Sequence, residues 1–332
     1  MPSSAAPKSR ILGTGAYAPE RVLSNADLEK LVDTSDAWIT ERTGIKERRV
    51  AADDQASSDM ALMAARRALE AAGLTAKDLD MIIVGTVTPD LPMPGCASIL
   101  QQKLGADAIP SFDVSAACAG FIYAMSIADQ FIRSGVQKRV LIVGVELLSR
   151  ILNWKDRTTC VLFGDGAGAA VLGPAGDDGS GILSTKLYTD AALVSSLCIP
   201  GGGSKERLTP EGLADQRDKV HMAGQDIFKV AVKNLTSASR SALEQAELPA
   251  SAVRWVVPHQ ANLRIIAQVA LRLDIPLERF VLNIERYGNT SSASIPIALD
   301  EGLRDGRIQR GDTVLMCALG AGISWGSALV RI

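Results

Sequence analysis

Cys118 lies in a sequence setting suited to nucleophilic chemistry, in the run DVSAACAGF. The pattern of residues 111–114 is that of a short strand. Residues 119–134 carry apolar side chains at helical spacing and are followed by Gly135, a good helix stop. Cys118 is therefore expected at the start of a helix, where unpaired N–H groups and the helix dipole favour a thiolate. A buried structural cysteine is the alternative interpretation.

Two further residues with suitable chemistry follow at similar junctions. His259, one of only two histidines, stands between a β pattern at 254–257 and a helix expected to begin near Asn262. Asn289 stands between a short apolar run at 280–284 and a helical stretch. A lone histidine or a lone Gly-Asn pair is usually structural. Three residues at predicted strand-to-helix junctions, where parallel α/β proteins gather their chemistry, together indicate a site.

The elements that must position these residues recur in two similar halves. Helix and strand patterns alternate along the chain, which predicts parallel α/β layers. The linker-like residues 174–180 separate an N-terminal half, 1–175, from a C-terminal half, 176–332. We therefore predict an internal duplication. The segments that correspond are 68–84 with 242–258, 140–144 with 314–318, and 168–172 with 326–330.

Composition narrows the class of protein. The hydrophobic fraction of 47% supplies a large core, and the formal net charge of −2 gives no bulk attraction for nucleic acid. No segment approaches the length of about 18 apolar residues that spans a bilayer, and the N-terminus lacks the apolar region of a secretory signal. The five cysteines form neither a disulfide framework nor a metal-binding spacing. These features predict a soluble, cytoplasmic protein that binds no metal.

Two glycine-rich stretches, at 13–15 and 164–168, invite a dinucleotide-binding interpretation. The second is followed by a strand pattern at 169–172 rather than by a helix, so the geometry that binds phosphate is not expected. An NAD-dependent oxidoreductase is therefore disfavoured. A non-catalytic scaffold would have no reason to keep all three junction residues.

Six motifs run in order along essentially the whole chain. They are WITERTGI (38–45), SAACAGF (115–121), FGDGAG (163–168), PHQAN (258–262), GNTS (288–291) and GAGISWG (320–326). In these motifs the chain resembles the β-ketoacyl-acyl-carrier-protein synthase III family, the initiating condensing enzymes of type II fatty-acid synthesis in the thiolase superfamily. The resemblance implies an α/β, thiolase-like αβαβα fold of five layers, built from two duplicated halves with the active site where they meet.

The resemblance also implies an acyltransferase with a Cys118, His259 and Asn289 triad. An acyl-CoA primer would acylate Cys118, and malonyl-acyl-carrier protein would then undergo decarboxylative Claisen condensation to a 3-oxoacyl-acyl-carrier protein. The N–H groups of Cys118 and Ala321 would form the oxyanion hole. His259 and Asn289 would donate to the enolate oxygen, since asparagine cannot act as a base at neutral pH. No metal or redox cofactor would be needed, and the coenzyme A thioester would be a substrate.

Residues that hold the substrates follow from the same resemblance. Trp38 and Arg42 are expected on one face of a short helix capped by Ser35 and ended by Gly44, where they would grip coenzyme A together with Arg157. A tryptophan packed over an arginine stem at the surface is the alternative. Candidates for binding the carrier protein, or else ordinary solvated charges, are Lys229, Arg264 and Arg272.

The acyl pocket is expected to be lined by Leu148, Phe163 and Cys198, with Met93 contributed across a homodimer interface. A flexible methionine there favours acyl groups longer than acetyl. Cys317, inside an apolar run, is interpreted as a core residue rather than a second catalytic cysteine. A related enzyme of specialised metabolism, of polyketide or quinolone type, remains the alternative because it would use the same triad.

Overall fold

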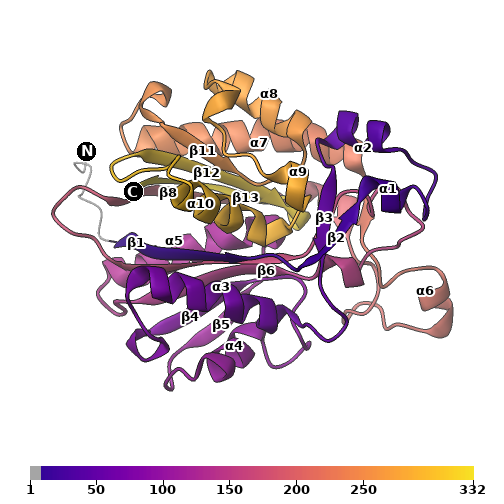
Figure 1. Ribbon diagram of the computed structural model, residues 1–332, viewed down its shortest axis with the longest axis horizontal. Helices are drawn as coiled ribbons and strands as arrows, with labels where there is room; N and C mark the ends of the chain where they lie inside the picture. Colours follow the sequence, from indigo (N-terminus) through magenta and orange to yellow (C-terminus); the bar gives the residue numbers. More distant parts are fainter. Residues whose placement is uncertain (1–8) are drawn as a thin grey trace.

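Two β-sheets stack with helical layers between them and on both outer faces (Figure 1). The computed structural model describes residues 9–332. The prediction that the N-terminus carries no secretory signal falls partly on residues 1–8, outside the described residues.

The two sheets share one topology. The N-terminal sheet has the order β1-β7-β6-β4-β5, and the C-terminal sheet has the order β8-β13-β12-β11. In each sheet the second strand in this order is antiparallel to both of its neighbours, and the pairs that follow are parallel. The N-terminal strands are β1 (Ser9–Tyr17), β4 (Met81–Gly85), β5 (Ser111–Val114), β6 (Val140–Glu146) and β7 (Gly166–Pro174); the C-terminal ones are β8 (Gly181–Thr189), β11 (Trp255–Pro258), β12 (Thr313–Gly320) and β13 (Ser324–Arg331).

The longer helices complete five layers. Helices α3 (Ser57–Ala72) and α4 (Cys96–Leu104) cover the outer face of the N-terminal sheet, and α7 (Gly224–Gln245) and α8 (Leu263–Leu273) cover that of the C-terminal sheet. Helices α5 (Gly120–Arg133) and α10 (Ser294–Arg304) lie between the sheets. The predicted five-layered α/β fold is therefore confirmed. The division at residue 175 falls in the β7–β8 connection and stays a prediction.

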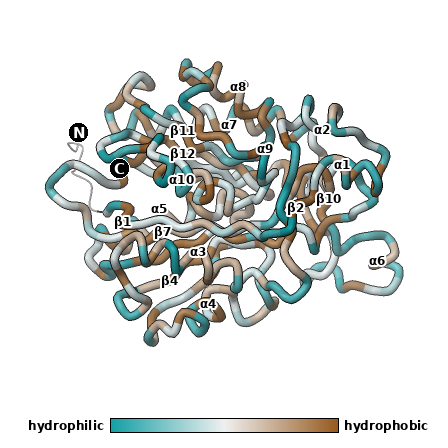
Figure 2. The backbone as a smooth tube through the Cα atoms, viewed as in Figure 1, coloured by the Kyte–Doolittle hydropathy of each residue, from teal (hydrophilic) through white to brown (hydrophobic). Residues whose placement is uncertain are grey.

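Smaller elements lie at one end of the layers and around the periphery (Figure 1). Among them, α2 is capped by Ser35 and ends at Gly44 in a left-handed conformation, as predicted. Figure 2 shows hydrophilic residues gathered in the loop that carries α6. These elements are α1 (Asn25–Leu28), α2 (Asp36–Thr43), α6 (Pro210–Ala214), α9 (Ile284–Tyr287), β2 (Arg21–Ser24), β3 (Glu47–Val50), β9 (Leu197–Cys198) and β10 (His221–Met222).

Close packing explains the first glycine-rich stretch. A Cβ at Gly13 would lie 2.5 Å from the backbone oxygen of Ala68 in α3, and one at Gly15 would collide with the backbone near Ala64. Real Cβ atoms essentially never approach so closely, so only glycine lets β1 lie against this alanine-rich helix. These glycines therefore serve helix–strand packing.

One predicted element does not form. The apolar run 280–284 makes only a single parallel bridge, between Phe280 and Val256, and α9 begins at Ile284. Its side chains are nevertheless buried, with Phe280 at 4% and Val281 at 0% exposure. The apolar pattern therefore indicates burial and not a strand. Asn289 follows the short helix α9 instead of a strand.

None of the helices among the described residues combines the length and hydrophobicity that crossing a membrane requires.

Candidate active site

Cys118 lies in the tight turn between β5 and α5. Residues Ala117–Ala119 form one 3₁₀ turn, and α5 begins at the next residue. Ala117 has a φ of 46°, a left-handed conformation that costs energy outside glycine and holds the turn sharply. The predicted place of Cys118 at a helix start is therefore confirmed.

A cavity of about 210 Å³ opens beside the Cys118 sulfur. Three of the predicted acyl-pocket residues, Leu148, Phe163 and Cys198, line it together with Ala321. Most of the lining is apolar, which suits a hydrocarbon chain. The remaining lining residues are Val87, Ala117, Ile151, Leu197, Ile199, Val220 and Ser291.

The turn at the end of β12 packs directly on the Cys118 turn. A Cβ at Gly320 would lie 2.5 Å from the Cys118 nitrogen and 2.9 Å from the Ala116 oxygen. Glycine at this position lets the two backbones touch, and it brings Ala321 to the cavity. The turn is thus a packed part of the site.

His259 follows the last residue of β11, and its ring is almost fully buried, at 4% exposure. Its Nδ1 lies 2.7 Å from the Ser294 hydroxyl, which also accepts a bond from the Gln260 N–H at 3.3 Å. Within the described chain the Ser294 proton has no other acceptor, so we assign it to Nδ1. The ring then carries its own proton on Nε2. Burial lowers the pKa of His259 to about 3, so the ring is neutral at pH 7.

Asn289 is held with its amide nitrogen available. Its Oδ1 accepts the Ser291 N–H at 2.8 Å, and its backbone bonds to Leu162 and Gly164. The described residues provide no acceptor for Nδ2. Within residues 9–332, both His259 Nε2 and Asn289 Nδ2 are therefore donors without a partner.

The short segment 289–294 joins all three predicted residues. Asn289 is its first residue, Ser291 lines the same cavity as Cys118, and the Ser294 hydroxyl is hydrogen-bonded to His259. The segment packs against the turn formed by residues 117–119. The three junction residues predicted from sequence are thus brought together around this segment.

The expected resting thiolate at Cys118 is wrong. Burial raises the pKa of the thiol to about 12; the charge of Glu146 raises it further and the Ser291 bond lowers it. A thiolate loses most of its hydration in this turn. The free-energy cost of that desolvation exceeds the stabilisation that one helix N-terminus provides. The resting nucleophile is a neutral thiol that must lose its proton during reaction.

Sequence reasoning missed Glu146, the last residue of β6. Its carboxyl group is fully buried among Thr88, Val87 N–H, Ser291 and Ser292. Burial raises its pKa to about 7, against the effect of these hydrogen bonds. A single acidic residue closing the otherwise uncharged strand VLIVGVE was the available signal.

Trp38, Arg42 and Arg157 form a cluster on and beside α2. The two guanidinium carbons lie 4.9 Å (Arg42) and 5.3 Å (Arg157) from the ring centre of Trp38. Arg157 also donates to the Asp33 carbonyl at 2.7 Å. The predicted shared face of Trp38 and Arg42 is confirmed.

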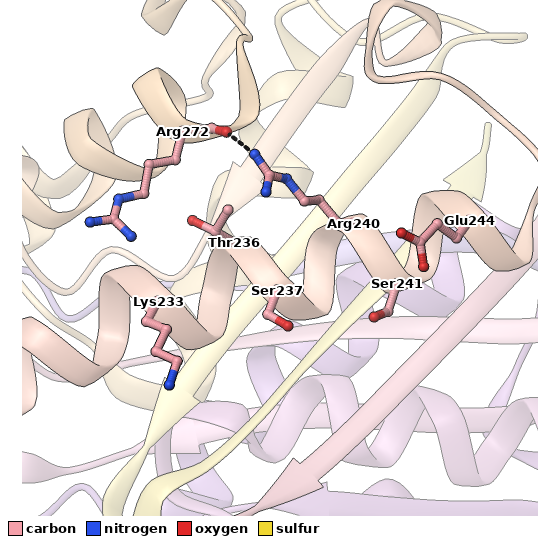
Figure 3. A pocket seen from close by; sticks show the side chains of 7 residues that line it. All are labelled: Lys233, Thr236, Ser237, Arg240, Ser241, Glu244 and Arg272. Carbon is pink, nitrogen blue, oxygen red and sulfur yellow. Dashed lines mark hydrogen bonds between the residues drawn. The ribbon is translucent and has the colours of Figure 1, made fainter.

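Lys229, Arg264 and Arg272 are exposed on α7 and α8. Arg264 lies 5.9 Å from the ring of Phe228, the residue before Lys229. Arg272 lies in the last turn of α8 at a groove against α7, where its carbonyl accepts a bond from Arg240 at 2.7 Å (Figure 3).

Two other predicted residues lie apart from the cavity. Met93 is 85% exposed and does not line it. Cys317 is fully buried in β12, as expected of a core residue, and burial raises its pKa to about 12. Within residues 9–332 no group of three or more His, Cys, Asp or Glu side chains could hold a metal ion.

Comparison with known proteins is consistent with this geometry. The family description "3-Oxoacyl-[acyl-carrier-protein (ACP)] synthase III" matches residues 112–191, and its C-terminal counterpart matches residues 243–332. A β-ketoacyl-[acyl-carrier-protein] synthase III from Xanthomonas campestris pv. campestris is 52% identical, over 97% of this chain and 98% of the relative.

Solved structures show the same similarity. A 3-oxoacyl-[acyl-carrier-protein] synthase III from Aquifex aeolicus is 47% identical with a TM-score of 0.90, covering 98% of this chain and 100% of that one. The priming β-ketosynthase of the R1128 polyketide pathway is 37% identical with a TM-score of 0.91, covering 100% and 98%. Identity of this extent along nearly the whole length, over the same layers, establishes that the chain belongs to the β-ketoacyl-[acyl-carrier-protein] synthase III family of condensing acyltransferases.

Proposed function

We propose that this protein initiates fatty-acid synthesis by condensing an acyl group from coenzyme A with malonyl-acyl-carrier protein. The observation that carries this proposal is the segment 289–294, which links the nucleophile turn, His259 and Asn289 beside an apolar cavity. The reaction runs by thioester chemistry alone, with no cofactor beyond the thioester substrates.

Cys118 is the nucleophile of the first half-reaction. Its sulfur attacks the acyl thioester, the S–H proton leaves, and coenzyme A departs as a thiol. The oxyanion accepts hydrogen bonds from the N–H groups of Cys118 and Ala321, and the tight contact at Gly320 supports this pairing. The acyl chain then occupies the cavity lined by Leu148, Phe163 and Cys198.

His259 and Asn289 act in the second half-reaction. Loss of carbon dioxide from the malonyl thioester leaves an enolate, whose oxygen carries the charge. The Nε2–H of His259 and the Nδ2–H of Asn289 donate to that oxygen, and neither needs to ionise. A neutral histidine suits this role because its low pKa keeps the donor in one state across the physiological range.

The cationic residues hold the two substrates in turn. Arg42 and Arg157 meet the phosphates of coenzyme A while the partly exposed Trp38 ring stacks on its base. Lys229 and Arg264 then attract the acidic carrier protein.

Arg272 extends the same positively charged side of α8. The groove beside it also contains Lys233 and Arg240, so a negatively charged partner meets several cations there (Figure 3).

A homodimer completes the acyl pocket. Met93 is exposed beside Leu91 and the partly exposed Phe112, which together leave apolar surface on this face. We propose that a second copy covers this surface and that Met93 of each subunit closes the pocket of the other.

A role in specialised metabolism is the second candidate, favoured by the 37% identity to the R1128 priming β-ketosynthase. The greater identity to synthases named for the acyl-carrier-protein reaction, 52% and 47%, supports the fatty-acid role.

Intact-protein mass spectrometry after mixing with a panel of acyl-CoAs tests the first half-reaction. We expect a mass increase of one acyl group that is absent in Cys118→Ala, with the chain-length preference read from the same spectra. Malonyl-acyl-carrier protein is then added to the acyl-enzyme, and 3-oxoacyl product is expected. Absence of acylation from every CoA would contradict the proposal and favour a carrier-bound donor.

A further inference from the structure

Glu146 is a buried acid directly behind the nucleophile turn, at the boundary of the two halves. Its carboxyl group is 0% exposed and accepts the Thr88 hydroxyl at 2.8 Å and the Val87 N–H at 3.1 Å. The hydroxyls of Ser291 and Ser292 each donate to it at 3.2 Å. Among the described residues no cation pairs with it, so no fixed positive charge holds the group permanently ionised.

The Ser291 hydroxyl stands between this carboxyl group and the reacting sulfur. It donates to Glu146 Oε1 at 3.2 Å, and Ser291 lines the same cavity as Cys118, whose turn packs against residues 291–293. The Ser291 backbone has a φ of 50°, an uncommon conformation that the surrounding packing maintains. The Ser291 hydroxyl is therefore placed to connect the cavity beside the sulfur with the buried carboxylate.

We propose that Ser291 and Glu146 relay the thiol proton of Cys118 during acylation, an inference that rests on the acylation step proposed above. The S–H bond breaks and its proton passes to Ser291 Oγ, while the original Ser291 proton passes to Glu146 Oε1. The sulfur electron pair forms the bond to the thioester carbonyl carbon. When the tetrahedral intermediate collapses, the bond to the coenzyme A sulfur breaks and that sulfur receives the proton back along the same chain.

The proposed hydrogen bonds are compatible with the proton on the sulfur and with the proton on Glu146. With the proton on sulfur, the thiol donates to Ser291, which donates to the carboxylate. With the proton on Glu146, the carboxylic acid donates to Ser291, which donates to the thiolate. Every buried polar group keeps a partner in either state, so the transfer leaves no unpaired donor or acceptor.

His259 is poorly suited to accept this proton. Burial lowers its pKa to about 3, and its Nδ1 is engaged by Ser294. Glu146, with a pKa raised to about 7, lies near the operating pH, where a general base is most effective. The titratable groups beside Glu146 are the thiols of Cys118 and Cys96, and burial raises the pKa of Cys96 so that it stays neutral.

Single-turnover acylation of the full-length protein from pH 5.5 to 9, quenched and read by intact-protein mass spectrometry, tests the relay. We expect the wild-type rate to rise with an inflection near pH 7. Glu146→Gln and Ser291→Ala should each lose this inflection and acylate about 100-fold more slowly at pH 7.5. The double variant should be no slower than either single variant, because both interrupt one chain.

Asp165→Asn is the matched control. Asp165 is also a fully buried carboxyl group whose pKa burial raises, but it is held by Ala51 and Ser149. We expect this variant to keep the wild-type pH profile, so a loss common to any buried carboxylate is separated from the relay.

Alkylation of Cys118 by iodoacetamide, read on its peptide, gives a second pH profile that needs no acyl donor. A wild-type profile without an inflection between pH 6 and 8 overturns the relay, whether or not the variants fold. An inflection retained in Glu146→Gln or Ser291→Ala also overturns it. Absence of acylation with an alkylation inflection that Glu146→Gln removes would instead contradict the proposed function and support the relay.

Discussion

The contact between Gly320 and the Cys118 turn offers a direct test of the oxyanion hole. In Gly320→Ala the new Cβ would lie 2.5 Å from the Cys118 nitrogen, whereas ordinary contact begins at 3.4 Å. The two turns must therefore separate by about 0.9 Å along this direction. Oxyanion donors act at about 2.7–3.1 Å, so a shift of this size removes one of them and should slow acylation by about 10²–10³-fold.

The assay is single-turnover acylation of Cys118 by acyl-CoA, with the thermal unfolding midpoint measured on the same samples. Overpacking here should also destabilise the fold by about 1–3 kcal/mol. Gly203→Ala is the control, because a Cβ there meets no atom within 4 Å and its backbone is not left-handed. A Gly320→Ala protein that acylates at the wild-type rate would refute the reasoning, since two N–H groups could not both keep their positions around an inserted methyl group.

Four further outcomes follow from the site. Alanine at His259 or Asn289 should reduce condensation far more than acylation of Cys118, because both side chains act on the enolate; following acyl-enzyme and 3-oxoacyl product separately measures this, and equal losses in both steps would contradict the division of roles. Met93→Phe should shift preference toward shorter acyl chains by filling the pocket end; the ratio of kcat/KM for long and short acyl-CoAs measures it, and an unchanged ratio would count against the dimer-completed pocket. Arg157→Ala should raise KM for acyl-CoA about tenfold or more with little change in kcat, since it removes a charged hydrogen-bond donor from the proposed phosphate site; a change in kcat alone would argue for another role. Because burial lowers the pKa of His259 from 6.5 to about 3, the unfolded chain binds this proton at higher pH than the folded chain; stability should therefore rise with pH between about 3 and 6.5, by up to about 1.4 kcal/mol per pH unit, and urea unfolding should show a shallower rise in His259→Gln.

Much of the fold could be predicted because its signals are local. The stripe on α5, which includes Phe121 and Met125, is apolar at helical spacing and is fully buried. Ser35 and Gly44 bound α2 because a side-chain cap and a left-handed glycine act within a few residues. The strand predicted at 280–284 was wrong for a related reason. Its hydrophobicity indicates burial, and both a strand and an irregular segment can be buried.

The residues of the site likewise divide into those that local sequence patterns predicted and one that they missed. Cys118 and His259 were predicted from their junctions, each defined by neighbouring residues. Glu146 was missed because its partners come from residues 86–88 and 291–292, far apart in the chain. No local sequence pattern around Glu146 predicts that these segments pack against it.

The sequence by itself determined which residues can do the chemistry and which turns carry them, because residue type, apolar spacing and caps act over short distances. Only the tertiary structure decided how the three junctions meet through segment 289–294. It also decided their protonation: the Cys118 thiol is neutral, His259 is uncharged, and the Glu146 pKa is near 7. These states follow from burial, and burial is produced by packing between segments that lie far apart in the sequence.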